Sequence, residues 1–199
     1  MRDAKRKLPA ERHGEILTKA VEISATEGLS AVTLRRVAAD LGVTPGLVSH
    51  YFSSAEQLIT AAFTTAAVAD LASARSLVAA ASTPTAKMAA LMDYVLDESS
   101  EDASALWLDA WSLGRRNDAL AAEANRLTDE WLACLGDVVR LGVGSGEFQV
   151  ADPDIAARRL LTMIDGLGAQ MVVRAVPADE AKHIARSYFT SELGIDSSD

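Results

Sequence analysis

Residues 33–52 read TLRRVAADLGVTPGLVSHYF, and this stretch predicts two short helices around a tight turn. Leu34, Val37, Ala38 and Leu41 recur at helical spacing, so the first helix has one apolar face. Two short helices joined in this way form a helix-turn-helix, a motif whose second helix commonly enters the major groove of DNA.

Residues at the helix ends support the same pattern. Thr33 can accept a hydrogen bond from the free N–H groups of the first helix, and Gly42 follows its last apolar position, where a left-handed residue is usual. Thr44 can cap the second helix, with Pro45 at the first helical position. Because caps, turn glycine and apolar spacing agree, the pattern favours a helix-turn-helix over an ordinary helical hairpin in a core.

The second helix presents small and polar side chains at its N-terminal end, while Leu47 and Val48 are expected in the core. Such a helix end suits the DNA major groove. The residues predicted to approach bases or the sugar backbone are Thr44, Pro45, Gly46 and Ser49. Those predicted to contact phosphates are Thr33, His50 and Tyr51, and Arg35 completes the predicted DNA-binding set.

The run from about Glu11 to Leu58 resembles the DNA-binding domain of the tetracycline-repressor (TetR) family of bacterial regulators. The residues that carry the resemblance are Ile16, Ala20, Gly28, Thr33, Val37, Ala38, Gly42, Val43, Gly46, Tyr51, Phe52 and Leu58. Two positions depart from the family pattern: Ser49 stands where Tyr is usual, and Ala55 stands where Lys is usual. The departure at Ala55 removes one phosphate contact that the resemblance implies.

The variant GLVSHYF, residues 46–52, is similar to the subgroup of the choline-sensing betaine-operon repressor, in which a small residue also replaces that Tyr. The stretch from Trp107 to Gln170 resembles the C-terminal domain of the same subgroup. The resemblance implies a homodimer that binds a double-stranded DNA operator, and a pocket for a small-molecule effector among the later helices. It does not fix the identity of that effector.

Charge is unevenly distributed along the chain, whose formal net charge is −9. Residues 1–55 hold eight Lys and Arg against six Asp and Glu, whereas residues 56–199 hold eleven against twenty-two. The N-terminal basic residues are Arg2, Lys5, Arg6, Lys7 and Arg12. A small positive end on an acidic body would turn that end toward DNA phosphates, although residues 2–7 alone could equally be a solubilising tail.

Helical periodicity continues along the chain and predicts an all-α fold of about nine helices, with an N-terminal three-helix helix-turn-helix domain followed by a C-terminal helical bundle. We place the DNA-binding domain at residues 1–53 and the effector-binding and dimerisation domain at residues 54–199. Outside the motif, the expected helices cover about 9–27, 54–81, from 84, 103–115, 117–141, 152–175 and 178–193. GVGSGEF at 142–148 is expected to be a loop, and Ser54 with Gln57 fits a capping box.

The last two predicted helices carry more apolar residues than one core-facing stripe needs. We predict that they meet their copies as a four-helix bundle in a two-fold dimer; a central helix buried within one chain is the alternative. The predicted dimer residues are Leu160, Ile164, Leu167, Met171, Ile184 and Tyr188.

The three tryptophans lie in the sixth and seventh predicted helices, and Trp107 and Trp111 are spaced to share one helix face, from which Asp109 points away. The predicted effector-binding residues are Phe63, Met88, Met92, Trp107, Trp111, Trp131 and Met163. Three readings stay open: a cavity for a bulky apolar effector, an aromatic box for a quaternary ammonium held by cation–π attraction, and plain packing.

No sequence pattern supports catalysis. His13, His50 and His183 each stand alone, Cys134 is the single cysteine and an expected core residue, and no nucleophile elbow or dinucleotide fingerprint occurs. We therefore predict no enzyme activity, no metal and no cofactor. The single cysteine, an N-terminus unlike a secretory signal and the charges in every segment of membrane length predict a cytoplasmic protein with no membrane partner.

These observations predict a ligand-responsive DNA-binding regulator, most often a repressor in this family, that binds a palindromic operator as a dimer and is released by an effector. The alternative is a DNA-binding regulator with no small-molecule effector. A thermal-shift screen separates the two, because a ligand that binds only the folded state stabilises it.

Overall fold

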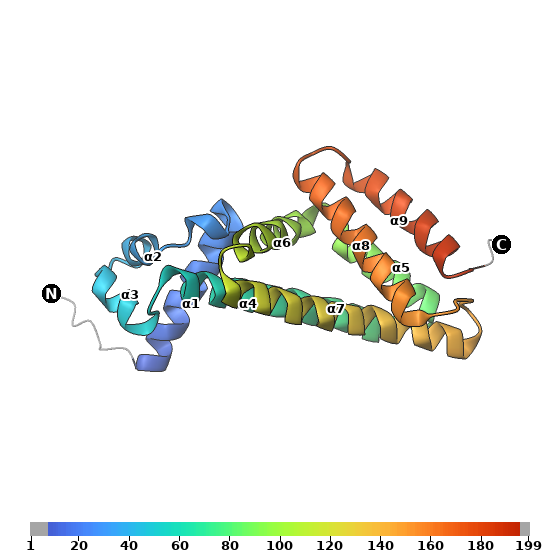
Figure 1. Ribbon diagram of the computed structural model, residues 1–199, viewed down its shortest axis with the longest axis horizontal. Helices are drawn as coiled ribbons and strands as arrows, with labels where there is room; N and C mark the ends of the chain where they lie inside the picture. Colours follow the sequence, from blue (N-terminus) through green and yellow to red (C-terminus); the bar gives the residue numbers. More distant parts are fainter. Residues whose placement is uncertain (1–7, 196–199) are drawn as a thin grey trace. The chain divides into compact units, whose positions relative to one another are not determined.

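The computed structural model describes residues 8–195, and all regular structure in this range is helical, which confirms the all-α prediction (Figure 1). The elements are α1 (Pro9–Glu27), η1 (Leu29–Ala31), α2 (Leu34–Asp40), α3 (Pro45–Tyr51), α4 (Ala55–Ala80), α5 (Pro84–Val95), η2 (Glu98–Ser100), α6 (Glu101–Gly114), α7 (Asp118–Ser145), α8 (Pro153–Val172) and α9 (Ala178–Glu192).

The chain divides into two compact units. In the described range, the first unit comprises residues 8–66 and 109–124, and the second comprises residues 67–108 and 125–195. Helices α4, α6 and α7 therefore each contribute residues to both units. The compact units do not follow a single boundary at residue 53, so the functional division at that point stays a prediction.

The first unit contains the predicted helix-turn-helix around its own apolar core. Ile16, Ala20 and Ile23 of α1 are buried together with Val37 of α2 and Val48 of α3. The α-helical spacing of these residues puts them on one face of each helix, so α2 and α3, which at seven residues each are too short to be stable alone, share one core with α1.

The turn between α2 and α3 is stabilised largely as the sequence predicts. Thr33 Oγ1 accepts a hydrogen bond from the Arg36 backbone N–H at 3.1 Å, which caps α2. Gly42 has a φ of +65°, and the following N–H, of Val43, reaches back to the Ala38 carbonyl at 2.9 Å. Thr44 occupies the predicted N-cap position of α3, before Pro45, but the capping bond expected from its hydroxyl is absent.

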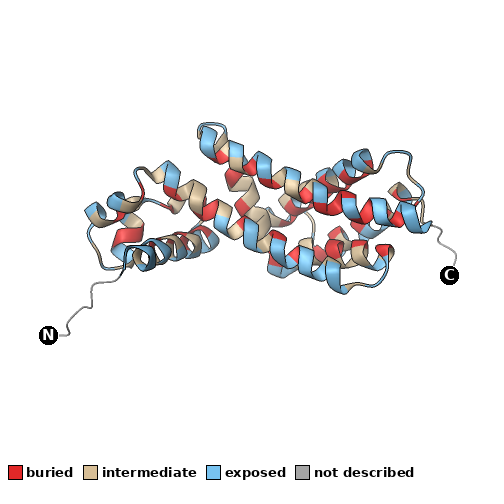
Figure 2. Ribbon diagram, turned by 90° about the horizontal axis from the view of Figure 1, so that it is seen from below, coloured by how far each residue is buried: buried red, intermediate tan, exposed pale blue. Residues whose placement is uncertain are grey.

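The second unit has a larger core, to which helices α4 to α9 contribute (Figure 2). Met88, Leu91 and Met92 of α5 are fully buried, as their spacing predicts. Helix α8 packs against both α9 and α5, and Figure 1 shows α8 and α9 side by side. Cys134 is also part of this core, and burial raises the pKa of its thiol, which suits a packing residue rather than a reactive one.

Two predicted helix ends are wrong, and tertiary contacts explain one of them. Helix α7 continues to Ser145 through part of the expected 142–148 loop, because the Phe148 ring packs on Gly142; a Cβ at this glycine would lie 2.0 Å from Phe148 Cδ2. Helix α8 ends at Val172, three residues earlier than predicted, just before Arg174 with a φ of +59°.

Helix ends in the second unit are capped by side chains from other elements. Lys87 Nζ donates to the Val78 and Ala81 carbonyls, each at 2.6 Å, at the end of α4. Glu147 Oε2 accepts hydrogen bonds from the Thr85 backbone N–H at 3.1 Å and from its hydroxyl at 2.9 Å, at the start of α5. These bonds satisfy groups that a helix leaves unpaired at its ends.

Helix α4 alone, among the described helices, is long and apolar enough to span a membrane by length and composition. A third of its most apolar window is buried inside the fold, and the core helix of a globular protein passes the same test.

Candidate DNA-binding and effector sites

The N-terminal end of α3 is an open surface made of small side chains. Thr44, Pro45, Gly46 and Ser49 are all exposed, and no atom lies within 4 Å of the position that a Cβ would take at Gly46. Ser49 Oγ donates to the Gly46 carbonyl at 3.1 Å, which uses its proton and leaves its oxygen lone pairs available. The backbone of α3 can therefore be approached closely at this end.

An aromatic group surrounds the C-terminal end of α3. The half-buried Tyr51 ring meets the exposed His50 ring edge to face, with centroids 5.3 Å apart. His13, from α1, stacks on the buried Phe52 ring at 4.8 Å and approaches Tyr51 at 6.4 Å. The position of His13 beside Tyr51 could not be predicted from the sequence, because it depends on the packing of α1 against the end of α3.

Ion pairs decide which basic side chains of the first unit are available. Arg36 pairs with Glu27 through two bonds of 2.6 and 2.7 Å and with Asp40 at 3.1 Å. Arg12 pairs with Glu15, and Lys19 pairs with Glu22. Among the Arg and Lys side chains between residues 8 and 66, the exposed Arg35 alone has no ion pair with a described residue. The basic residues Arg2, Lys5, Arg6 and Lys7 lie outside the described residues.

A contact that the sequence did not reveal joins α6 to the turn after α1. Asp109 Oδ2 accepts a hydrogen bond from the backbone N–H of Leu29 at 2.7 Å. The preceding residue, Gly28, has a φ of +86°, and a Cβ there would lie 2.7 Å from the same oxygen. The predicted direction of Asp109, away from the tryptophan face, gave no hint of this partner.

The predicted effector residues divide between the two units. Met88, Met92 and Trp131 are buried in the core of the second unit, and Trp107 and Met163 pack against it. Phe63 is fully buried in the first unit, and Trp111, 38% exposed, also belongs to the first unit. The structure therefore brings five of the seven residues to one core.

One unpaired polar group lies in the same core. Trp131 is 6% exposed, and its indole Nε1 has no hydrogen-bond partner among the described residues. A buried N–H without an acceptor costs free energy, so such groups are rare in folded proteins. This indole is the strongest sign of a binding site within the second unit.

Two carboxyl groups of the second unit have pKa values above the usual range. Burial raises the pKa of Asp165, on α8, to about 6. Burial also raises the pKa of Asp70, on α4, although the hydrogen bond from the Tyr94 hydroxyl, 2.6 Å long, opposes this shift. Neither carboxylate has an ion pair with a described Arg or Lys. The raised pKa of neither residue could be predicted from the sequence, because a lone Asp in an apolar helix does not show what will surround it in the fold.

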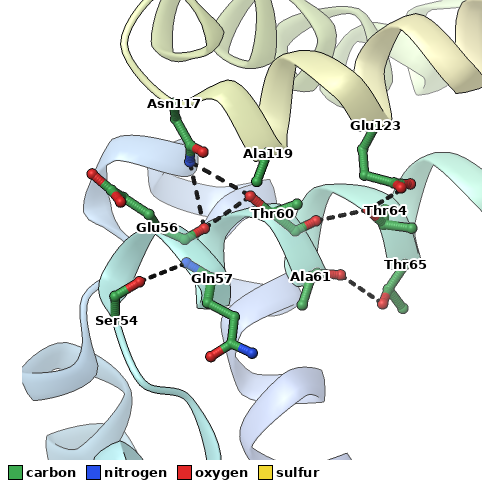
Figure 3. Close-up of a pocket in the computed structure, with 10 residues that line it drawn as sticks. All are labelled: Ser54, Glu56, Gln57, Thr60, Ala61, Thr64, Thr65, Asn117, Ala119 and Glu123. Atoms are coloured by element: carbon green, nitrogen blue, oxygen red, sulfur yellow. Dashed lines mark hydrogen bonds between the residues drawn. The ribbon is translucent and has the colours of Figure 1, made fainter.

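A separate hollow of about 520 Å³ lies on the first unit, between the start of α4 and the start of α7 (Figure 3). Its threonine hydroxyls donate to carbonyls of their own helix, as Thr60 does to Glu56 at 2.9 Å and Thr65 does to Ala61 at 2.8 Å. No predicted site residue lines it. The hydroxyl protons of these threonines are therefore already used within α4.

The predicted dimer residues are largely buried within the chain itself. Leu160 has no exposed surface, and Ile164, Leu167 and Met171 are each less than a tenth exposed. Much of the apolar excess of α8 is thus accounted for by the core of one chain. On the predicted list, Ile184 is exposed and Tyr188 is half-buried, so α9 keeps apolar surface for a second copy.

Within residues 8–195, no three His, Cys, Asp or Glu side chains come together in an arrangement that could hold a metal ion.

Comparisons with known proteins agree with this arrangement. Residues 16–62 match the family model described as bacterial regulatory proteins, tetR family, and residues 84–194 match the model described as BetI-type transcriptional repressor, C-terminal. The second match covers more than half of the chain. The chain therefore belongs to the TetR family of transcriptional regulators and has a BetI-type C-terminal domain.

Similar proteins match this chain over most of their length. The HTH-type transcriptional regulator BetI 1 of Chromohalobacter salexigens is 28% identical over 189 residues, covering 92% of this chain and 90% of the relative. BetI of Rhizobium meliloti is 27% identical over 168 residues, covering 83% and 80%. A solved structure of a regulator from Saccharomonospora viridis in complex with choline has a TM-score of 0.81 at 22% identity, covering 90% of this chain and 95% of that chain, and shows the shared fold.

Proposed function

We propose that this regulator is a cytoplasmic repressor that binds a palindromic operator as a homodimer and releases it when a small quaternary ammonium compound, such as choline, binds in the second unit. The released, ligand-bound state must place the two recognition helices at a distance that no longer matches successive major grooves, about 34 Å apart. The exposed N-terminal end of α3 supports the DNA-binding part of the proposal, and the unpaired indole N–H of Trp131 in the second unit supports the effector part.

Operator recognition rests on the small side chains of α3. Gly46 and Ser49 leave room for the helix to approach bases, while Thr44 keeps a hydroxyl that caps nothing. Tyr51 and Arg35 are proposed to contact phosphates, which position the protein without reading sequence. Two copies are required because a palindromic operator has two half-sites, one for each recognition helix.

The proposed class of effector rests on two polar groups of the second unit that lack partners. Buried carboxylates are usually paired with a cation, and buried donors usually have an acceptor, yet Asp165 and the Trp131 indole N–H lack these partners among the described residues. A cation would pair with the Asp165 carboxylate, and an oxygen acceptor would accept a hydrogen bond from the Trp131 indole. Trp107 and Trp131 add aromatic rings, which attract quaternary ammonium groups. The choline complex of the similar regulator agrees with this class.

The unpaired Trp131 indole is the observation that carries the effector proposal, and three compounds test it. Choline has both a charge and a hydroxyl, tetramethylammonium lacks the hydroxyl, and 3,3-dimethylbutan-1-ol is the neutral isostere of choline. We expect choline to bind most tightly and the neutral alcohol at least about tenfold more weakly, a difference of about 1.4 kcal/mol. Titration followed by tryptophan fluorescence measures all three affinities.

Substitutions assign the two contacts separately. Trp131→Phe removes the N–H and keeps an aromatic ring, so it should reduce the preference for choline over tetramethylammonium. Asp165→Asn should weaken both cations, whereas Asp129→Asn, at an exposed position on α7, is the matched control. Equal affinity for choline and for its neutral isostere would refute a cationic effector. If no compound in a broad thermal-shift screen bound, the regulator would act without an effector.

A further inference from the structure

The carboxylate of Asp109 links α6 to the helix-turn-helix. Asp109 and Leu29 are 80 positions apart in sequence, and the Asp109 Oδ2 to Leu29 N distance is 2.7 Å. A hydrogen bond to an ionised acceptor is stronger than one between neutral groups. Leu29 is the first residue of η1, the short turn that joins α1 to α2, so the bond holds this turn against α6.

The backbone conformation of Gly28, and its lack of a side chain, allow this contact. With a φ of 86° and a ψ of 163°, it adopts a conformation that is essentially restricted to glycine. A Cβ at this position would lie 2.7 Å from Asp109 Oδ2, closer than any real side chain would allow. The backbone of Gly28 therefore lets the Asp109 carboxylate reach the N–H that follows.

Two residues that follow α6, Asn117 and Glu123, make longer polar contacts with α4. Asn117 Nδ2 lies 3.5 Å from the Glu56 carbonyl and 3.5 Å from Thr60 Oγ1, and Thr64 Oγ1 lies 3.4 Å from Glu123. These distances are at the outer limit for hydrogen bonds. The hydrogen bond from the Leu29 N–H to Asp109 is shorter than these contacts, and it joins α6 to the segment between α1 and α2.

We propose that Asp109 is a positioning residue that couples α6 to the recognition helix, so that a change in α6 caused by the effector alters operator binding through Leu29. This proposal deepens, and rests on, the proposed function. Trp107 precedes Asp109 by two positions on α6 and packs in the core of the second unit, where the effector is proposed to bind. The same helix thus carries an effector residue and the carboxylate that supports η1.

A first experiment uses DNA alone, because coupling between two sites is reciprocal. The full-length protein is studied by hydrogen exchange, with and without a duplex obtained by in vitro selection with the wild type. In the wild type, DNA binding should slow amide exchange in α6 as well as in α3. In Asp109→Ala the slowing should persist in α3 and disappear from α6. Asp109→Asn keeps an acceptor oxygen and should retain the slowing in both helices.

Controls separate coupling from general damage. Asp129→Ala, at an exposed carboxylate of α7, should behave as the wild type. If Asp109→Ala failed to fold, Asp109→Ser would repeat the test, since its hydroxyl is too short to reach Leu29. The proposal is overturned if a folded variant without the carboxylate keeps the slowing in α6, or if the wild type shows no slowing there.

A second experiment uses choline chloride as the probe. In the wild type it should lower the affinity for the selected duplex by roughly 5- to 150-fold, the usual range for coupled sites. In Asp109→Ala the change should fall to about twofold or less, while choline affinity in the absence of DNA stays at the wild-type value. A wild-type-sized response in Asp109→Ala overturns the proposal. If the wild type does not respond to choline, the effector class is wrong, and the exchange experiment alone decides the role of Asp109.

Discussion

Replacing Asp165 with Asn should stabilise the unliganded protein at neutral pH. Burial raises the pKa of Asp165 from 3.8 to about 6, so the ionised form is disfavoured in the folded state. Asn is nearly the same size as a protonated Asp and cannot ionise. The substitution should therefore remove the cost of a buried charge without leaving a cavity.

The size and the pH window of this effect follow from the pKa values. A shift in pKa from 3.8 to about 6 corresponds to a change of about 3 kcal/mol in the free energy of unfolding. Because Asp165 is half-buried, water screens its charge, and we expect an effect of about 2 kcal/mol. Since the folded-state pKa is the higher one, the folded protein holds a proton that the unfolded chain has already released. Stability thus falls as pH rises from about 4 to 6 and stays lower above that range.

Thermal unfolding of the wild type and Asp165→Asn from pH 4 to pH 8 measures this prediction. At pH 7.5 the variant should melt about 4–8 °C higher, and the difference should largely vanish near pH 4. Asp129→Asn should show no such pattern. If the variant were stabilised equally at every pH, ionisation of Asp165 would not be the cause. If Asp165→Asn were no more stable than the wild type at pH 7.5, burial of the Asp165 carboxylate would not be destabilising. Choline should reduce the difference, because a bound cation offsets the buried charge.

Further outcomes concern the core and the DNA-binding surface. Gly142→Ala should cost about 1–3 kcal/mol in denaturant unfolding, since the added Cβ meets the Phe148 ring. Tyr51→Phe should weaken binding to all duplexes alike in titrations against a randomised library; a change in preferred bases would contradict a phosphate contact. Arg35→Ala should reduce the slope of log affinity against log salt by about 0.9 for each half-site, whereas Arg36→Ala, at a side chain held by Glu27, should leave that slope nearly unchanged.

The helices of the first unit could be predicted closely because their signals are local. Pro9 and Pro45 start α1 and α3, Thr33 caps α2, and Gly42 takes a positive φ after it. Each of these preferences depends on a few neighbouring residues, so periodicity and end signals were sufficient there.

The end of α7 could not be predicted in the same way. Glycines at 142, 144 and 146 favour a loop by composition, yet α7 continues to Ser145 and ends before Gly146, whose φ is +79°. The decisive contact is that of Phe148 with Gly142, a packing interaction that repays the low helix propensity of glycine. Tertiary packing thus overrode a local preference.

The surroundings of the candidate functional residues could not be predicted for a similar reason. The aromatic and methionine residues of the second unit were identified by type, but Trp111 and Phe63 belong to the first unit, which spacing along a helix does not reveal. Asp109 and Asp165 look alike as lone carboxylates in apolar helices. One meets a backbone N–H and the other meets an apolar surrounding, and only the fold distinguishes them.

Pairing of charges also changes how the basic N-terminal region should be interpreted. Counting residues suggests an excess of positive charge before residue 55, but Arg12, Lys19 and Arg36 each have a carboxylate partner in the same unit. A paired cation attracts phosphate less, because its partner must be screened or displaced first. Among the described residues of this region, Arg35 is the unpaired cation, so the paired side chains give each half-site less attraction to phosphate than a count of residues suggests. We expect the close approach of α3 to the groove, which the open surface at Gly46 permits, and the simultaneous binding of two copies to supply part of the affinity for DNA.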